Sequence, residues 1–111
     1  MAKFSFSEEL YKGKSVNDLI LFAIHSINNK RQKCTFEKLI KECFTLFPRA
    51  FSFSKYKKWP DSRKLDRPLR ALRNKKMITG DPKTYFSLTK NGEKSAEEIV
   101  RTLKQTKLKF K

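Results

Sequence analysis

Residues 63–92 read RKLDRPLRALRNKKMITGDPKTYFSLTKNG and combine one amphipathic helix with two short apolar segments around a turn. Four polar residues of this helix follow at spacings of four, three and four: Arg63, Arg67, Arg70 and Asn74. At about 100° per residue they share one narrow stripe. The opposite face carries three leucines: Leu65, Leu69 and Leu72. We therefore expect the leucines to pack into a core and the arginines to face an anionic partner.

Pro68 stands inside this predicted helix. It lacks a backbone donor, and it disfavours helical geometry at Arg67. Two interpretations follow: the helix is kinked at the proline, or it becomes regular only near Asp66. In the second case Arg63 leaves the stripe. The helix is expected to end at about residue 75.

Positive charge is concentrated in one part of the chain. The formal net charge is +16, and residues 48–92 contribute +10 of it, with 13 Lys and Arg against 3 Asp and Glu. Such a patch raises the local concentration of a polyanion, and phosphate contacts gain from counterion release. A lysine-rich solvated surface is the alternative for the scattered lysines, but it explains the arginine spacing less well.

Length and composition limit the classes of protein to consider. The 111 residues suit one domain, and the 38% hydrophobic content, with ten phenylalanines, argues against disorder. No apolar run approaches the roughly 20 residues that span a bilayer. The first ten residues, MAKFSFSEEL, lack the apolar region of a secretory signal, so a cytoplasmic protein is expected.

Catalytic and metal-binding motifs are not found in the sequence. Cys34 and Cys43 lack CxxC spacing, and His25 is the single histidine, so neither a zinc site nor any other cofactor is expected. There are no paired carboxylates, and three glycines cannot form a phosphate-binding loop. The chain is not expected to be an enzyme.

Two helices are predicted before the arginine helix. Ser15 caps the first, whose apolar stripe is Val16, Ile20, Ala23, Ile24 and Ile27. Thr35 caps the second, whose stripe is Phe36, Leu39, Ile40, Cys43, Phe44 and Phe47. Cys43 is therefore expected to be buried and unreactive. Cys34, which precedes the second helix, is expected to be accessible.

A long connection, residues 48–60, joins the second predicted helix to the third. Near its end basic and aromatic residues alternate: Lys55, Tyr56, Lys57, Lys58 and Trp59. Such a stretch can lie along a phosphate backbone and stack bases. The more common arrangement, and the one favoured here, has the aromatic rings in the core and only the lysines facing out.

The remaining elements are a hairpin and a fourth helix. Residues 77–79 and 84–88 are predicted strands around a turn at 80–83, and Asp61 or Ser62 is expected to cap the helix before them. Thr89 is expected to cap the last helix. Its buried stripe is Ala96, Ile99, Val100 and Leu103.

The order helix, helix, helix, two-stranded hairpin, helix resembles the winged helix-turn-helix domain. The likeness rests on R-x-L-R-x-L-R-N-K-K-M-I at residues 67–78 and Y-F-S-L-T-K-N-G at 85–92. The second motif is similar to the Y-x-L-T-x-x-G of MarR- and PadR-type regulators. The first is similar to their third helix and the start of their wing, with Lys76 where a glycine commonly stands.

The resemblance implies a mainly α fold with a small antiparallel β-hairpin: a three-helix core, a wing and a C-terminal helix. It divides the chain into a lead-in segment (1–14), a winged-helix domain (15–105) and a basic tail (106–111). Its implied function is transcriptional regulation by double-stranded DNA binding, with the third helix in the major groove and the wing on the backbone. The long connection, Pro68 and the short wing depart from the family pattern.

The DNA-binding residues expected from the motifs and the charge pattern are Arg63, Lys64, Arg67, Arg70, Asn74 and Lys83, with Lys57 and Lys58 of the connection. Arginine can bond a guanine edge or a phosphate bidentately, and asparagine can do the same to adenine. A homodimer through the C-terminal helix or the N-terminal segment is a further expectation. The alternative is a subunit of a larger complex whose basic face docks on a protein or on RNA.

Overall fold

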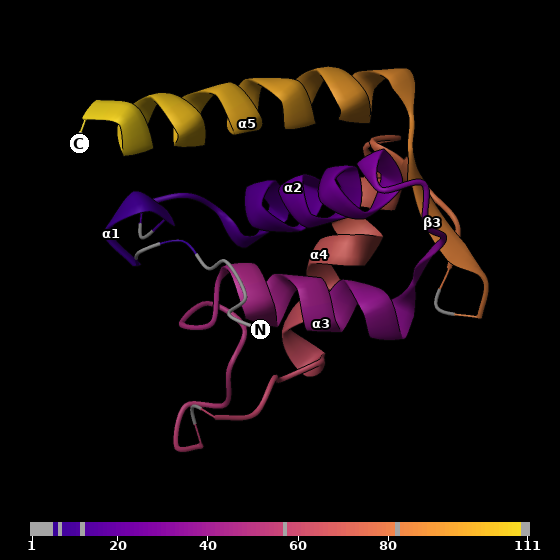
Figure 1. Cartoon of the computed structure of the whole chain (residues 1–111). Helices are drawn as coiled ribbons and strands as arrows, with labels where there is room; N and C mark the ends of the chain where they lie inside the picture. The colour runs from indigo at the N-terminus through magenta and orange to yellow at the C-terminus, as the bar shows by residue number, and fades with distance from the viewer. Residues whose placement is uncertain (1–5, 7, 12, 57, 82, 110–111) are drawn as a thin grey trace.

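The computed structural model describes residues 6, 8–11, 13–56, 58–81 and 83–109, which form a mainly helical domain with a small antiparallel sheet (Figure 1). The helices are α1 (Glu8–Tyr11), α2 (Val16–Asn29), α3 (Phe36–Leu46), α4 (Arg63–Asn74) and α5 (Lys90–Lys109). The strands are β1 (Cys34–Thr35), β2 (Ile78–Thr79) and β3 (Tyr85–Leu88). The domain boundary expected at residue 105 thus falls inside α5.

Helix α2 lies at the centre of the fold. It packs against α3, α4, α5 and β3, and Figure 1 shows α5 running along one side of it and α3 along the other. Its buried residues are Leu19, Ile20, Leu21, Ala23, Ile24 and Ile27. The predicted stripe is confirmed except at Val16, which is half-buried. A helix this apolar needs neighbours on most sides, and the other helices supply them.

The first two predicted helix caps are confirmed. The Ser15 hydroxyl accepts a hydrogen bond from the Asp18 N–H at 3.2 Å, and the Thr35 hydroxyl accepts one from the Lys38 N–H at 3.2 Å. Each bond satisfies a backbone donor that has no partner within the helix. Both helices therefore begin where local sequence chemistry predicts.

Phe6 and Tyr11, from the described part of segment 1–14, belong to the core. The ring of Phe6 stacks on Phe47 with the centroids 5.4 Å apart, and Tyr11 meets the same ring edge-on at 5.0 Å. The Phe6 N–H donates to the Leu46 carbonyl at 2.9 Å, and the Tyr11 hydroxyl accepts from the Arg49 N–H at 3.2 Å. These contacts stabilise the end of α3 from a segment expected to be only a lead-in.

The sheet has the order β1-β3-β2. The predicted hairpin is confirmed, with Ile78 opposite Leu88. Strand β1 was not predicted, since two residues are too short for a period-two pattern; it places Cys34 opposite Phe86. Cys34 is consequently fully buried, and its expected accessibility is wrong.

The end of α4 forces one basic residue into the left-handed region. Lys76 has φ +58°, its N–H donates to the Arg73 carbonyl at 3.0 Å, and the Met77 N–H donates to the Leu72 carbonyl at 2.9 Å. These two bonds form a Schellman motif, whose left-handed position usually holds glycine. Lys76 therefore occupies a glycine-type position, as the comparison of motifs implied.

Thr89 joins this corner to α5. Its hydroxyl lies 2.6 Å from the Lys76 carbonyl oxygen and accepts from the Gly92 N–H at 3.1 Å, which confirms the predicted cap. A Cβ atom at Gly92 would clash with the Met77 carbonyl oxygen. The T-x-x-G sequence thus allows α5 to start directly against the end of α4 and the base of the hairpin.

Candidate nucleic-acid interface

Helix α4 has one buried face and one cationic face. Leu65, Leu69 and Leu72 are 0%, 5% and 2% exposed, as predicted. The opposite face is exposed and carries Arg67, Arg70 and Asn74, and Arg73 is exposed at its margin. Since the leucines hold the helix against α2, the guanidinium groups are presented from a fixed backbone.

The helix runs through Pro68 and begins at Arg63. Of the two interpretations of the proline, the one in which the helix becomes regular only near Asp66 is wrong. Pro68 has no N–H to donate to the carbonyl of Lys64, so one bond of the helical ladder is missing there. Arg63 remains on the helix, but its side chain is held in a different way from the other arginines.

Asp61 holds Arg63 at the start of α4. The Asp61 carboxylate accepts from the Arg63 backbone N–H at 3.1 Å and from its guanidinium at 3.1 and 3.3 Å. The side-chain hydrogen bond from Arg63 is the main reason why the pKa of Asp61 lies below its usual value. The guanidinium also lies 5.4 Å from the ring centre of Phe53. Arg63 is exposed, yet it is already bound within the protein.

Lys64 points away from the predicted DNA-binding face. Its ammonium group donates to the backbone carbonyl of Ser52 at 2.6 Å. This bond joins the first turn of α4 to the connection that precedes it. The ammonium group of Lys64, for which a phosphate contact was expected, is thus engaged within the protein by the carbonyl of buried Ser52.

A weak ion pair links Arg70 to the neighbouring turn of α4. The Arg70 guanidinium lies 3.5 Å from the Asp66 carboxylate, and the two side chains are 71% and 65% exposed. Exposed pairs of this kind contribute roughly 0–1 kcal/mol. Arg70 can therefore exchange Asp66 for a stronger anion at little cost.

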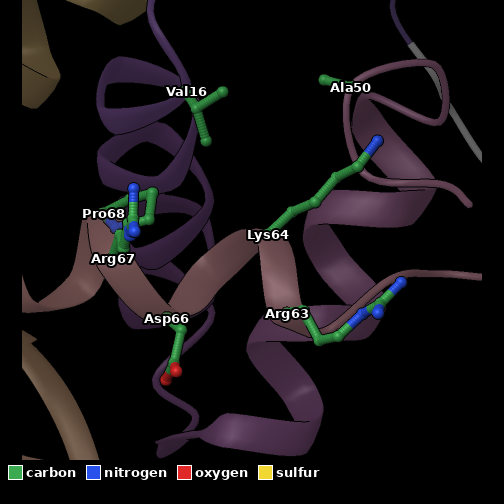
Figure 2. A pocket seen from close by; sticks show the side chains of 7 residues that line it. All are labelled: Val16, Ala50, Arg63, Lys64, Asp66, Arg67 and Pro68. Atoms are coloured by element: carbon green, nitrogen blue, oxygen red, sulfur yellow. The ribbon is translucent and has the colours of Figure 1, made fainter.

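An open hollow of about 500 Å³ lies beside the first half of α4. Figure 2 shows the residues that line it: Val16, Ala50, Arg63, Lys64, Asp66, Arg67 and Pro68. In this view the Arg63 side chain extends away from Arg67. The structure thus brings two of the predicted arginines to one hollow without making them converge on a single point.

The hairpin turn presents Lys83 at its tip. The Asp81 carboxylate accepts from the backbone N–H groups of Lys83 at 2.8 Å and Thr84 at 3.1 Å, which holds the turn closed. Gly80 has φ +102°, a conformation that favours glycine. The Lys83 side chain is exposed, as expected for a wing-tip contact.

The connection differs from the favoured expectation. Tyr56 and Trp59 are 65% and 61% exposed, so these two rings are not in the core; Phe51, at 1%, is. Lys58 is exposed, and Lys57 lies outside the described residues. An alternation of aromatic and basic residues does not by itself show which rings have room inside, since that depends on the packing around Phe47 and Phe51.

Sequence reasoning missed three exposed basic residues at the end of α4: Arg73, Lys75 and Lys76. They extend the cationic face from the helix toward the hairpin. The sequence feature that could have identified them is the basic segment R-N-K-K at residues 73–76, whose members do not share one helical stripe.

The thiols of Cys34 and Cys43 are buried and protonated near neutral pH. Burial raises the pKa of Cys34 to about 12 and raises that of Cys43 well above its usual value. Across the described residues no group of three or more His, Cys, Asp or Glu side chains is arranged to hold a metal ion. None of the helices in that part of the chain is long and apolar enough to cross a membrane.

Comparisons with known proteins give no match, so the role of this interface is inferred from its chemistry. No protein-family model matches the chain, and no curated protein or solved structure matches it.

Proposed function

We propose that this chain is a winged helix-turn-helix protein that binds double-stranded DNA and regulates transcription. The observation that carries the proposal is the two-faced helix α4, anchored by three buried leucines and exposing Arg67, Arg70 and Asn74. The order of α2, α3, α4, the β2-β3 hairpin and α5 agrees with the order in that domain.

Each group has a distinct role in this proposal. Arg67, Arg70 and Asn74 enter the major groove, where planar guanidinium and amide groups distinguish guanine and adenine edges. Lys83 at the hairpin tip and Lys58 in the connection meet phosphates, which position the protein without reading sequence. Arg63 stays bound to Asp61 and contributes through its charge rather than by reading a base.

The salt dependence of duplex binding tests the proposal. About five or six phosphate contacts by the lysines and arginines of residues 55–83 give a slope near −5 in a plot of log affinity against log salt concentration, at roughly −0.9 per contact. The measurement is fluorescence anisotropy of a labelled blunt duplex over a range of potassium chloride concentrations. A slope flatter than about −2 would show that the cationic face is not the binding surface.

Recovery of genomic DNA fragments by the purified protein, followed by sequencing, tests the regulatory part. Enrichment of one palindromic site supports a regulator that binds as a homodimer, through α5 or the N-terminal segment. Uniform recovery indicates architectural binding instead. Binding to an acidic protein or to RNA without duplex affinity would replace this proposal with that of a docking subunit.

A further inference from the structure

The described part of the connection between α3 and α4 is a projection held by backbone hydrogen bonds. Ser52 and Pro60 form an antiparallel bridge, and the Phe53 N–H donates to the Trp59 carbonyl at 3.1 Å. The Asp61 N–H donates to the carbonyl of buried Phe51 at 2.7 Å. Figure 1 shows this segment extending beyond the helices. Its backbone bonds give residues near its tip a defined position.

Two aromatic side chains near that tip form an exposed pair. The rings of Tyr56 and Trp59 are stacked, with centroids 5.9 Å apart and planes inclined by 24°. Both are more than half exposed. The Trp59 backbone N–H also donates to the Tyr56 carbonyl at 3.1 Å, which links the two residues through the backbone as well. Neighbouring large apolar side chains exposed together are the kind of surface that marks a binding site.

The surroundings of this aromatic pair select the charge of its ligand. Lys55 and Lys58 line the same surface hollow as the two rings. Aromatic faces by themselves attract cations, but two lysines beside them repel a cationic ligand. A ligand that combines a flat π surface with negative charge fits both features. A nucleotide has this combination, because its base stacks while its phosphate meets an ammonium group.

We propose that Tyr56 and Trp59 stack an unpaired base of a single-stranded DNA segment, with Lys55 and Lys58 on the flanking phosphates. The inference rests on the proposed nucleic-acid function. It extends the proposed ligand from fully paired DNA to duplex DNA that carries a stretch of unpaired bases. Nucleic acid is favoured over other anionic partners because the segment is continuous with α4. Lys64 bonds to Ser52, and the Arg63 guanidinium lies over Phe53.

Trp59 is the only tryptophan of the chain, so its fluorescence reports on this site alone. The first probe is oligothymidylate of about 12 nucleotides, a length within the range that single-strand sites cover. We expect strong quenching of Trp59 by this oligonucleotide and weaker quenching by a blunt duplex. Equal quenching by both would overturn base stacking, and no quenching at saturation would overturn the site. Quenching by phosphatidylserine vesicles but not by oligothymidylate would reassign the aromatic pair to a membrane surface.

The second measurement compares a blunt duplex with the same duplex carrying a single-stranded thymidine extension. Stacking of one base is worth a change of roughly five- to 150-fold in affinity. We expect the extension to tighten binding within this range, and Tyr56→Ala to abolish the gain while blunt-duplex affinity stays the same. Trp59→Phe, which keeps a ring, should retain most of the gain. If Tyr56→Ala leaves the gain intact, the proposal is wrong.

A matched control is available on the sheet. Tyr85 is another exposed tyrosine beside a lysine, with the Lys33 ammonium 5.4 Å from its ring centre. Tyr85→Ala should leave the gain from the extension unchanged; an equal loss would show that any exposed tyrosine acts this way. Failure of the proposed duplex function would give a different result. The protein would then bind a blunt duplex weakly, Arg67→Ala would not weaken that binding further, and oligothymidylate would still quench Trp59.

Discussion

The carboxylate of Asp61 binds Arg63 through both its backbone N–H and its guanidinium, at 3.1 to 3.3 Å. Asp61 is buried, whereas the Arg63 side chain is 79% exposed. Asp61, which precedes the N-cap residue Ser62, thus satisfies the first backbone N–H of α4 and also binds the guanidinium of the first arginine of the stripe. Arg67, one turn later, has no such neighbour among the ion pairs of the described residues. The two arginines are expected to behave differently when replaced.

Arg67→Ala and Arg70→Ala should each weaken duplex binding by about 1–3 kcal/mol and relax sequence preference, since they are proposed to read base edges. Lys83→Ala should cost less and act equally on all sequences. Arg63→Ala should lower the melting temperature more than Arg67→Ala and weaken binding less. Anisotropy titrations and thermal unfolding measure both effects. Unchanged affinity in Arg67→Ala and Arg70→Ala would mean that α4 does not recognise DNA.

Leu69→Ala should destabilise the folded protein by about 2–5 kcal/mol, because it leaves a cavity between α4 and the core. Arg67→Ala is the control on the opposite face, where the change in unfolding free energy should stay within about 0.5 kcal/mol. Urea unfolding followed by circular dichroism gives both values. Comparable destabilisation by the two substitutions would show that the stripe is structural.

Asp61 should make stability depend on pH in the acid range. Its pKa is lowered in the folded protein, so its contribution is complete above the unfolded carboxyl pKa of about 4 and is lost as pH falls further. Asp61→Asn keeps an oxygen acceptor for the Arg63 N–H but removes the charge. Its melting temperature should therefore lie below wild type near neutral pH and approach it in acid. If the melting temperatures of wild type and Asp61→Asn change in parallel with pH, this assignment is wrong. Asp61→Ala, which also lacks the oxygen acceptor, should be less stable than Asp61→Asn at every pH.

Lys76→Gly should stabilise the protein by about 0.5–1 kcal/mol, because glycine adopts a positive φ without the steric cost that lysine bears there. Lys75→Gly is the matched control, since Lys75 has φ −82° and gains nothing from the change. Chemical denaturation of the two variants should give shifts of opposite sign. Destabilisation by both would show that the Lys76 side chain contributes more than its backbone strain costs.

Cys34 and Cys43 should react slowly with a thiol reagent at about pH 8 in the native protein and quickly in denaturant. Both are fully buried, and the pKa of Cys34 is raised to about 12, so almost no thiolate forms near neutral pH. The absorbance of the released chromophore follows the reaction. Fast labelling of Cys34 would show that it lies outside the β1-β3 pairing.

Helices α2, α3, α4 and α5, and the side-chain caps of α2, α3 and α5, could be predicted from local chemistry alone. Apolar residues at helical spacing predict α2, α3 and the leucine face of α4. The hydroxyl residues Ser15, Thr35 and Thr89 mark the starts of α2, α3 and α5. These features depend on residues within one or two turns of each other. A single sequence therefore contains all the information that they require.

Contacts between residues distant in the chain decided the rest. Strand β1 exists because it pairs with β3, fifty residues later, and that pairing buries Cys34. Lys64 turns inward because the Ser52 carbonyl lies within reach, and Tyr56 and Trp59 stay outside while Phe51 enters the core. Periodicity specifies which face of a helix is apolar. Which ring finds space inside, and which cation finds an internal partner, depends on how the elements pack, and only the tertiary structure determines that.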